Sequence, residues 1–146
     1  MKRIITIITV LLTAVIAVQA QEKHMSKEEF QARQRQFITD VAGLTESEAD
    51  KFFPLYFELQ VKKNELNREM WDNMHKAKER ELTEEEYESI TETIAKLRIE
   101  SDELELEYLR KYKKFLTSKK IFQIIRAEMR FHREFLRDAK DKKGPK

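Results

Sequence analysis

The stretch GLTESEADKFFPLYFELQ, residues 43–60, carries the signals from which the fold of the chain can be worked out. Gly43 is the kind of residue that ends a helix, and Thr45 is an N-cap residue that begins the next one. Glu48 stands three residues after Thr45, so the two complete a capping box. Apolar residues then recur at helical spacing. Pro54 interrupts them without a backbone N–H to donate, which predicts a bend or a local opening of this helix.

The dipeptide Leu-Thr that precedes this helix occurs again before two further long periodic segments. Glu86 completes a second capping box after Thr83, whereas Lys120 stands at that position after Thr117 and predicts a weaker cap, with Ser118 as the alternative. Short connections of two or three residues make successive helices antiparallel neighbours. We therefore predict an all-α chain of four helices over residues 27–42, 46–80, 84–115 and 118–140, with helices 2 and 3 long.

Composition supports this fold class and excludes several kinds of site. Charged residues make up 38% of the chain, and there is no Cys, so no disulfide framework forms. Gly43 and Gly144 are the only glycines, which excludes a glycine-rich phosphate loop or a dinucleotide fingerprint. Alternating β-branched runs typical of strands are also absent.

The first 20 residues are typical of a secretory signal peptide, with Lys2 and Arg3 before an apolar run and a cleavage site after Ala20. The alternative is a membrane anchor, but the run is short for a span of about 20 residues. The signal holds two of the 29 basic residues and no acid, which leaves 27 residues of each sign. We expect one periplasmic domain over residues 21–140, a disordered tail over 141–146, no stable membrane insertion and no nucleic-acid partner.

The predicted helix 84–115 is apolar on two faces. One face is a heptad seam that runs from Tyr87 through Leu97 to Tyr108. The other lies about 150° or more from Leu97, and a helix that is apolar on two faces is usually covered on both. We therefore predict a homodimer whose interface contains Ala95, Ile99, Leu106 and Leu109.

A candidate client-binding surface lies on the predicted helix 46–80. Three aromatic residues fall roughly 100–140° from the line of Phe52 and Leu59, so they do not join the same buried stripe. In the alternative interpretation, the first helix covers them with its own apolar residues. The candidate surface consists of Phe53, Phe57 and Trp71, with a basic rim of Arg33, Arg35, Lys62 and Lys63 that would attract acidic unfolded segments.

Charge is segregated along the second half of the chain. Residues 84–107 hold ten acids and two bases, whereas residues 110–137 hold ten bases and two acids. If the last two helices form a hairpin, the two segments face each other as a ladder of ion pairs. That ladder would place Glu100, Glu103 and Glu107 opposite Arg126, Arg130 and Arg133. The alternative is a basic patch for an anionic partner.

The sequence gives little indication of a catalytic site or a metal site. His75 with Glu79, and Glu128 with His132, have the i, i+4 spacing of a shared metal, but a zinc site needs three or four protein ligands. His132 falls on the apolar face of its helix and is predicted to lie in the core. No nucleophile and base form a recognisable pattern. We expect a protein that is not an enzyme and has no cofactor and no metal site.

The signal peptide, the Cys-free helical body and the Leu-Thr helix starts resemble the Spy/CpxP group of periplasmic proteins, which is marked by an LTxxQ motif. Here Glu48 and Lys120 stand where that motif has Gln. The resemblance implies a thin, curved, cradle-like helical dimer of bent hairpins, whose concave face binds unfolded envelope proteins without ATP. It therefore predicts an ATP-independent chaperone or adaptor. The alternatives are a regulatory protein that binds the sensor of an envelope-stress system, or a metal-responsive sensor.

Overall fold

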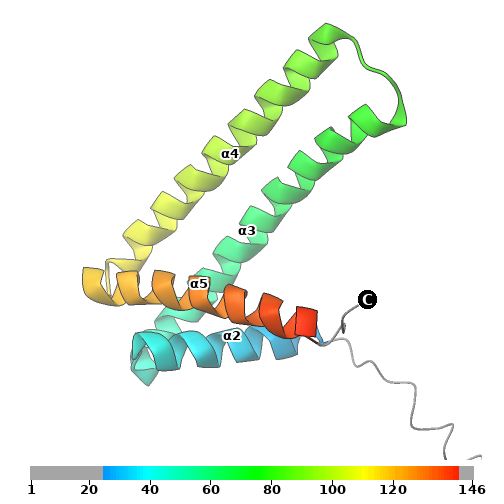
Figure 1. The fold of residues 1–146 in the computed structure, drawn as a ribbon. Helices are drawn as coiled ribbons and strands as arrows, with labels where there is room; N and C mark the ends of the chain where they lie inside the picture. Colours follow the sequence, from blue (N-terminus) through cyan, green and yellow to red (C-terminus); the bar gives the residue numbers. More distant parts are fainter. Residues whose placement is uncertain (1–24, 142–146) are drawn as a thin grey trace, which may run out of the picture. The chain divides into compact units, whose positions relative to one another are not determined.

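The computed structural model describes residues 25–141, and within that range the chain forms four α-helices and no strand (Figure 1). This confirms the predicted all-α fold. The predicted signal peptide and nearly all of the predicted tail lie outside the described residues. The helices are α2 (Lys27–Ala42), α3 (Glu46–Glu79), α4 (Glu84–Tyr112) and α5 (Ser118–Asp141).

The chain divides into two units, Met1–Ala32 and Arg33–Lys146. The described part of the first unit begins α2, where Ser26 and Glu29 exchange hydrogen bonds of 3.1 Å as the capping pattern predicts. The second unit holds the rest of α2 and the other three helices. All contacts described below lie within this second unit.

Helices α3 and α4 begin as predicted, at two complete capping boxes. Thr45 and Thr83 each accept a backbone hydrogen bond from the residue three positions later, and Glu48 and Glu86 accept one in return. At the start of α5, the Thr117 hydroxyl accepts from the Lys120 N–H at 3.2 Å, so Thr117 is the cap there. Each helix start predicted from Leu-Thr therefore rests on the threonine itself.

Lys120 departs from the capping pattern because its side chain has another role. Its ammonium group donates to the carbonyl oxygen of Gly43 and forms an ion pair of 2.9 Å with Glu48. Gly43 ends α2 with a φ of 64°, a left-handed conformation that glycine adopts without strain. One lysine thus ties the start of α5 to the turn between α2 and α3.

Helix α3 continues through Pro54, which lies inside it with an exposed ring. The bend or local opening predicted near Pro54 stays a prediction. Helix α4 ends at Tyr112, three residues before the predicted end. Tight turns after it explain the difference, because the Phe115 N–H donates to the Tyr112 carbonyl at 3.1 Å.

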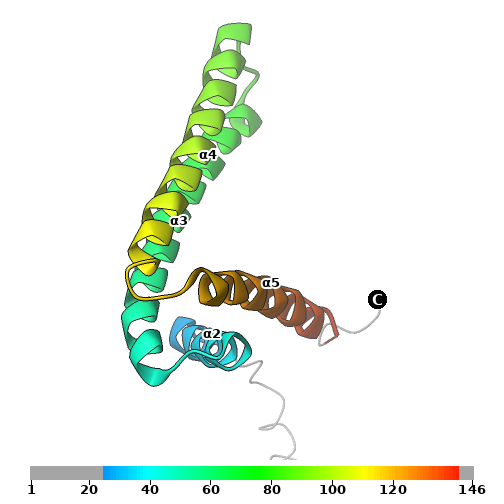
Figure 2. The same ribbon diagram turned by 90° about the vertical axis from the view of Figure 1, so that its left-hand side faces the viewer.

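The predicted ladder between the last two helices does not form. Glu107 pairs with Lys111 at 2.8 Å and Arg130 pairs with Glu134 at 2.7 Å, each on its own helix. Figure 2 shows α3 and α4 side by side, whereas α5 leaves the end of α4 in a different direction. Helix α5 instead packs beside the second half of α2, where the Phe37 and Phe131 rings are 5.5 Å apart.

Burial separates two regions, which we call the base and the arm. The arm is residues 61–103, the part of the α3–α4 hairpin farther from α5, and among its described side chains the buried hydrophobic ones are those of Leu82 and Leu97. The base is residues 33–60 and 104–141. It contains one aromatic-rich core, to which α2, α3, α4 and α5 all contribute. That core consists of Ile38, Ala42, Leu44, Ala49, Phe52, Phe53, Tyr56, Leu59, Tyr108, Tyr112, Leu116, Ile121, Ile124 and Ala127.

Candidate functional site

The client-binding surface predicted on α3 is wrong in its central residue. Phe53 is fully buried, with 0% of its surface exposed. The guanidinium carbon of Arg35, on α2, lies 5.0 Å from the centre of the Phe53 ring, so α2 covers this face of α3. Phe57 is half-buried and packs against the same core. This arrangement corresponds to the alternative in which the first helix covers the aromatics.

The remaining residues of that predicted surface do not gather into one patch. Trp71 is exposed, but it stands 14 positions after Phe57 on one continuous helix, which corresponds to about 21 Å along the helix axis. Three of the four rim cations are paired: Arg35 with Asp50 at 2.7 Å, Lys62 with Glu58 at 3.0 Å, and Lys63 with Glu105 at 2.6 Å. Arg33 is exposed. Most of the positive charge of the predicted rim is therefore already neutralised by neighbouring carboxylates.

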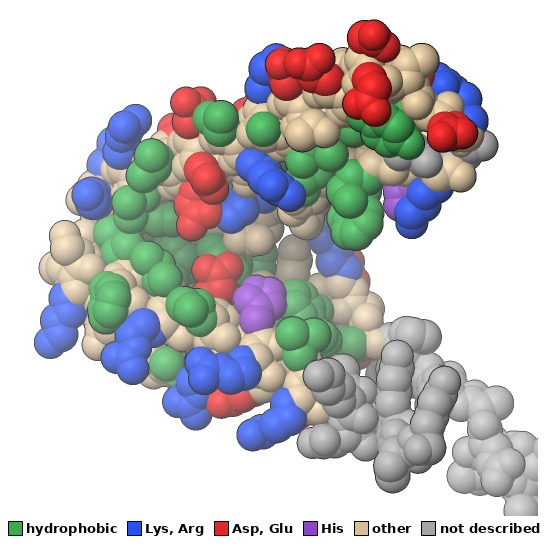
Figure 3. All heavy atoms as spheres, turned by 45° about the horizontal axis from the view of Figure 1, so that its top comes forward, with side chains coloured by type: hydrophobic (Ala, Val, Ile, Leu, Met, Phe, Trp, Pro, Cys, Tyr) green, Lys and Arg blue, Asp and Glu red, His purple; other side chains and the backbone are tan. Residues whose placement is uncertain are grey.

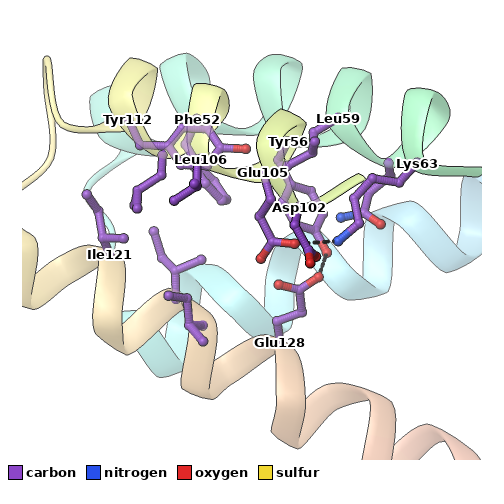
Figure 4. Close-up of a pocket in the computed structure, with 14 residues that line it drawn as sticks. Phe52, Tyr56, Leu59, Lys63, Asp102, Glu105, Leu106, Tyr112, Ile121 and Glu128 are labelled. Carbon is purple, nitrogen blue, oxygen red and sulfur yellow. Dashed lines mark hydrogen bonds and ion pairs between the residues drawn. The ribbon is translucent and has the colours of Figure 1, made fainter. Parts of the chain in front are cut away.

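The structure places a different candidate site in a groove between α3, α4 and α5, with a volume of about 410 Å³ (Figure 4). The groove exists because α4 and α5 diverge from the short turn that joins them, and α3 lies behind both. It is lined by Phe52, Tyr56, Leu59, Gln60, Lys63, Asp102, Glu105, Leu106, Leu109, Tyr112, Ile121, Ile124, Ile125 and Glu128.

The groove has an apolar end and a polar end. Figure 4 shows Phe52, Tyr112 and Ile121 together at one end, near the α4–α5 turn. Asp102 and Glu128 lie at the other end, which we call the mouth. Figure 3 shows hydrophobic side chains gathered in a hollow of the molecular surface, with acidic, basic and histidine side chains beside them.

Tyr56 links the floor of the groove to its mouth. Its hydroxyl donates to Oε1 of Glu128 at 2.8 Å and accepts from Nε2 of Gln34, also at 2.8 Å. Burial, and then the negative charge of Glu128, raise the pKa of Tyr56 well above its ordinary value. The hydroxyl therefore stays protonated at neutral pH and holds the Glu128 carboxylate in place.

Tyr112 lines the groove with a hydroxyl that has no hydrogen-bond partner among the described residues. The residue is 8% exposed. Burial raises the pKa of Tyr112, and the negative charge of Glu128 raises it further, so this hydroxyl is also protonated. A buried polar group without a partner costs about 1–3 kcal/mol. A hydrogen-bond acceptor that reached the Tyr112 hydroxyl would remove this cost.

The predicted dimer interface is divided between the two regions. Leu106 and Leu109 line the groove, whereas Ala95 and Ile99 are exposed in the arm. Ile99 is 58% exposed and Leu106 is 52% exposed, which agrees with a second apolar face on α4. Dimerisation itself stays a prediction.

The sequence did not predict most of the groove. Helical periodicity shows which residues share a face of one helix, but it does not show which faces of different helices meet. Tyr112, Ile125 and Glu128 come together only because α5 departs from α4 at the turn. Ile121 and Ile124 join the groove for the same reason, because α5 does not run back along α4 as the antiparallel neighbour that the short connection predicted. The only signal in the sequence was the wide apolar face of α5, which extends from Ile124 round to Ile125.

A metal centre has no support in the described part of the chain. Within residues 25–141, no three His, Asp or Glu side chains come close enough together to hold an ion. Nδ1 of His75 lies 2.8 Å from the carbonyl oxygen of Trp71. His132 is exposed, so its predicted place in the core is wrong. It lies beyond the buried stripe of α5 that includes Phe131.

Comparisons of the chain with models of protein families, with characterised proteins and with solved structures find no match. Within residues 25–141, every helix falls short of the length and apolar character that a membrane span requires. The candidate function therefore rests on the groove and on the sequence patterns.

Proposed function

We propose that this protein is a periplasmic, ATP-independent chaperone or adaptor that binds apolar segments of unfolded envelope proteins in the groove between α3, α4 and α5. The observation that carries the proposal is an open groove with an aromatic floor and exposed aliphatic walls. Leu106 on α4 is 52% exposed and Ile125 on α5 is 46% exposed, and both line the groove. Contiguous exposed apolar surface of this kind marks a binding site.

The groove suits side chains of an unfolded segment better than a compact polar ligand. Phe52, Tyr56 and Leu59 form a floor that the base holds rigidly, because all three are buried core residues. Apolar side chains that enter would gain about 25 cal/mol per Å² removed from water. Such contacts carry little sequence specificity, as a chaperone requires.

Binding is proposed to be an equilibrium without nucleotide hydrolysis. With Gly43 and Gly144 as its only glycines, the chain has no glycine-rich loop for phosphates. The periplasmic location rests on the predicted signal peptide. Release of a client would then follow from the client's own folding, which buries the apolar residues that the groove holds.

A test compares two pairs of substitutions with matched exposure. Leu106→Ser with Ile125→Ser removes apolar surface from both walls of the groove. Val61→Ser with Met74→Ser removes similar surface from the arm, where the two residues are 44% and 42% exposed. We expect the groove pair to lose most of its suppression of aggregation of several unrelated unfolded proteins. The arm pair should suppress aggregation as the wild type does.

Circular dichroism should show unchanged helicity and nearly unchanged melting temperatures for both pairs. Full suppression by the groove pair would contradict the assignment of this site. Tight binding of one envelope sensor, with no suppression of aggregation, would favour the regulatory alternative. Dependence of suppression on added zinc would favour the metal-responsive alternative.

A further inference from the structure

We propose that the groove selects apolar segments that carry a cationic group, a Lys or Arg side chain next to apolar residues. This inference rests on the proposed function and names the class of segment that the same site prefers. It is carried by the charges at the mouth, the position of the apolar end and the Tyr112 hydroxyl.

The mouth has an excess of negative charge. Its lining contains three carboxylates and one ammonium group. Lys63 pairs with Glu105 at 2.6 Å, and this pair leaves the carboxylates of Asp102 and Glu128 without a cation. Asp102 is exposed and takes part in no ion pair with the described residues. Glu128 accepts a hydrogen bond from the Tyr56 hydroxyl, which is a neutral donor.

The arginines of α5 do not offset this charge. Arg126 and Arg130 lie about 160° around the helix from Glu128, and Arg130 is already paired with Glu134 at 2.7 Å. The basic side of α5 therefore faces away from the groove. Neither arginine therefore supplies a cation to the mouth, where a cationic group of the bound segment can pair with Asp102 and Glu128.

Tyr112 provides a separate observation that points to a ligand. The residue lines the groove, and its buried hydroxyl has no hydrogen-bond partner among the described residues. A peptide segment supplies backbone carbonyl groups, which accept hydrogen bonds from such a hydroxyl. An apolar side chain next to that carbonyl would then fill the end of the groove near Ile121.

These features define one arrangement of the bound segment. Apolar side chains lie against Phe52 and Tyr112, and a cationic side chain a few residues along the segment reaches Asp102 and Glu128. The sign of this preference is opposite to the one expected from the basic rim in the sequence. Acidic segments, which that rim would attract, are repelled at the mouth.

Three labelled peptides test the preference directly. They share one core of Leu and Phe residues with blocked ends, and differ at a single position that holds Lys, Gln or Glu. Fluorescence anisotropy should show the Lys peptide binding about fivefold more tightly than the Gln peptide, and the Glu peptide binding more weakly still. The difference should shrink as salt is added, because ions screen an open mouth.

Two double variants with the same change in net charge locate the effect. Asp102→Asn with Glu128→Gln should make the three peptides bind with equal affinity. Glu100→Gln with Glu103→Gln changes exposed carboxylates that do not line the groove, and it should keep the full preference. The single variant Asp102→Asn changes one exposed residue and should reduce the preference even if the first double variant is unstable.

The possible outcomes separate the inference from the function on which it rests. Equal binding of the three peptides to the wild type would overturn the cation preference and leave the apolar groove as a binding site. Tighter binding of the Glu peptide would also overturn the preference. Failure of every peptide to bind would overturn both proposals.

Discussion

The base and the arm are built from the same two long helices, yet they bury their side chains very differently. In the base, Phe52 and Phe53 are consecutive residues of α3, and both are buried, at 1% and 0% exposure. In the arm, Trp71 and Ile99 are more than half exposed. The difference follows from the number of partners, because α2 and α5 cover the hairpin only in the base.

One end of the hairpin therefore provides most of the stability, whereas the other end leaves apolar side chains accessible. Most of the stability of a helix in a protein comes from packing of its apolar face rather than from its intrinsic propensity. The base therefore holds the fold together and gives the groove a rigid floor. The arm buries Leu82 and Leu97, half-buries a few more apolar residues of its seam, and leaves others such as Trp71 and Ile99 exposed.

The largest expected effect comes from removing a core ring in the base. Phe53→Ala should lower the free energy of unfolding by about 3–5 kcal/mol, because it deletes a fully buried aromatic ring. Trp71→Ala in the arm removes a larger ring that is 55% exposed and should cost less than about 1 kcal/mol. Urea denaturation followed by circular dichroism measures both, and equal losses would contradict the division into base and arm.

The burial of Phe53 shows where sequence reasoning reached its limit. Helical periodicity correctly predicted four helices, and Thr45 and Thr83 correctly predicted where α3 and α4 begin. Periodicity also assumes that a helix buries a single stripe. The first half of α3 is covered from two sides, so its apolar surface extends round to Phe53, about 100° from Phe52.

The groove could not be predicted for a related reason. A connection of a few residues after Tyr112 brings α5 next to α4, but it does not determine the angle between them. Packing of Ile121 and Ile124 into the base determines that angle. The pairing of Lys120 with Glu48 across 72 positions is likewise a contact that no local pattern contains.

A smaller effect is expected from the hydrogen-bonded tyrosine of the base. Tyr56→Phe should cost about 1–3 kcal/mol, because it leaves the Gln34 amide buried without its acceptor and removes the donor to Glu128. Tyr87→Phe is the matched change in the arm, where the ring is 40% exposed, and it should be nearly neutral. Chemical denaturation of the two variants gives the comparison, and a neutral Tyr56→Phe would show that the Gln34–Tyr56–Glu128 chain does not stabilise the base.

The two regions should also differ in what their interhelical ion pairs contribute. Lys120→Gln removes a pair in which both side chains are 24% exposed, together with a bond to Gly43, and should cost about 1–2 kcal/mol. Arg80→Gln removes the pair with Glu86 at the tip of the arm, where the arginine is 61% exposed. That loss should be smaller and should vanish in high salt. A greater loss for Arg80→Gln would reverse the comparison.

The caps of α3 and α4 predict sensitivity to acid in both regions. The Arg80 guanidinium, and then the Thr83 N–H, lower the pKa of Glu86 to about 2. The Thr45 N–H, and then Lys120, lower the pKa of Glu48 below its ordinary value. Since the folded-state pKa is depressed, these carboxylates stabilise the protein above their unfolded-state pKa, and the effect is lost as pH falls towards the folded-state value.

For Glu86 the loss should fall between the ordinary pKa of 4.5 and about 2. Titration of its carboxyl carbon by NMR should give a midpoint near 2 in the wild type. In Arg80→Gln the midpoint should move up towards the ordinary value, because the main cause of the shift has been removed. An unchanged midpoint in this variant would show that Arg80 does not hold the Glu86 carboxylate.

The smallest effect on stability, but the clearest effect on assembly, is expected at the exposed face of the arm. Ile99 is 58% exposed on the side of α4 opposite its heptad seam, and Ala95, one turn earlier, is also exposed. We propose that this face is covered by a second copy in a two-fold arrangement.

Ile99→Glu should leave the free energy of unfolding of a single copy within about 0.5 kcal/mol of wild type. It should also turn a dimer into a folded monomer in light scattering. Val61→Glu, at a residue of α3 that is 44% exposed, is the matched control and should remain dimeric. A wild type that is already monomeric in light scattering would overturn the proposed dimer interface.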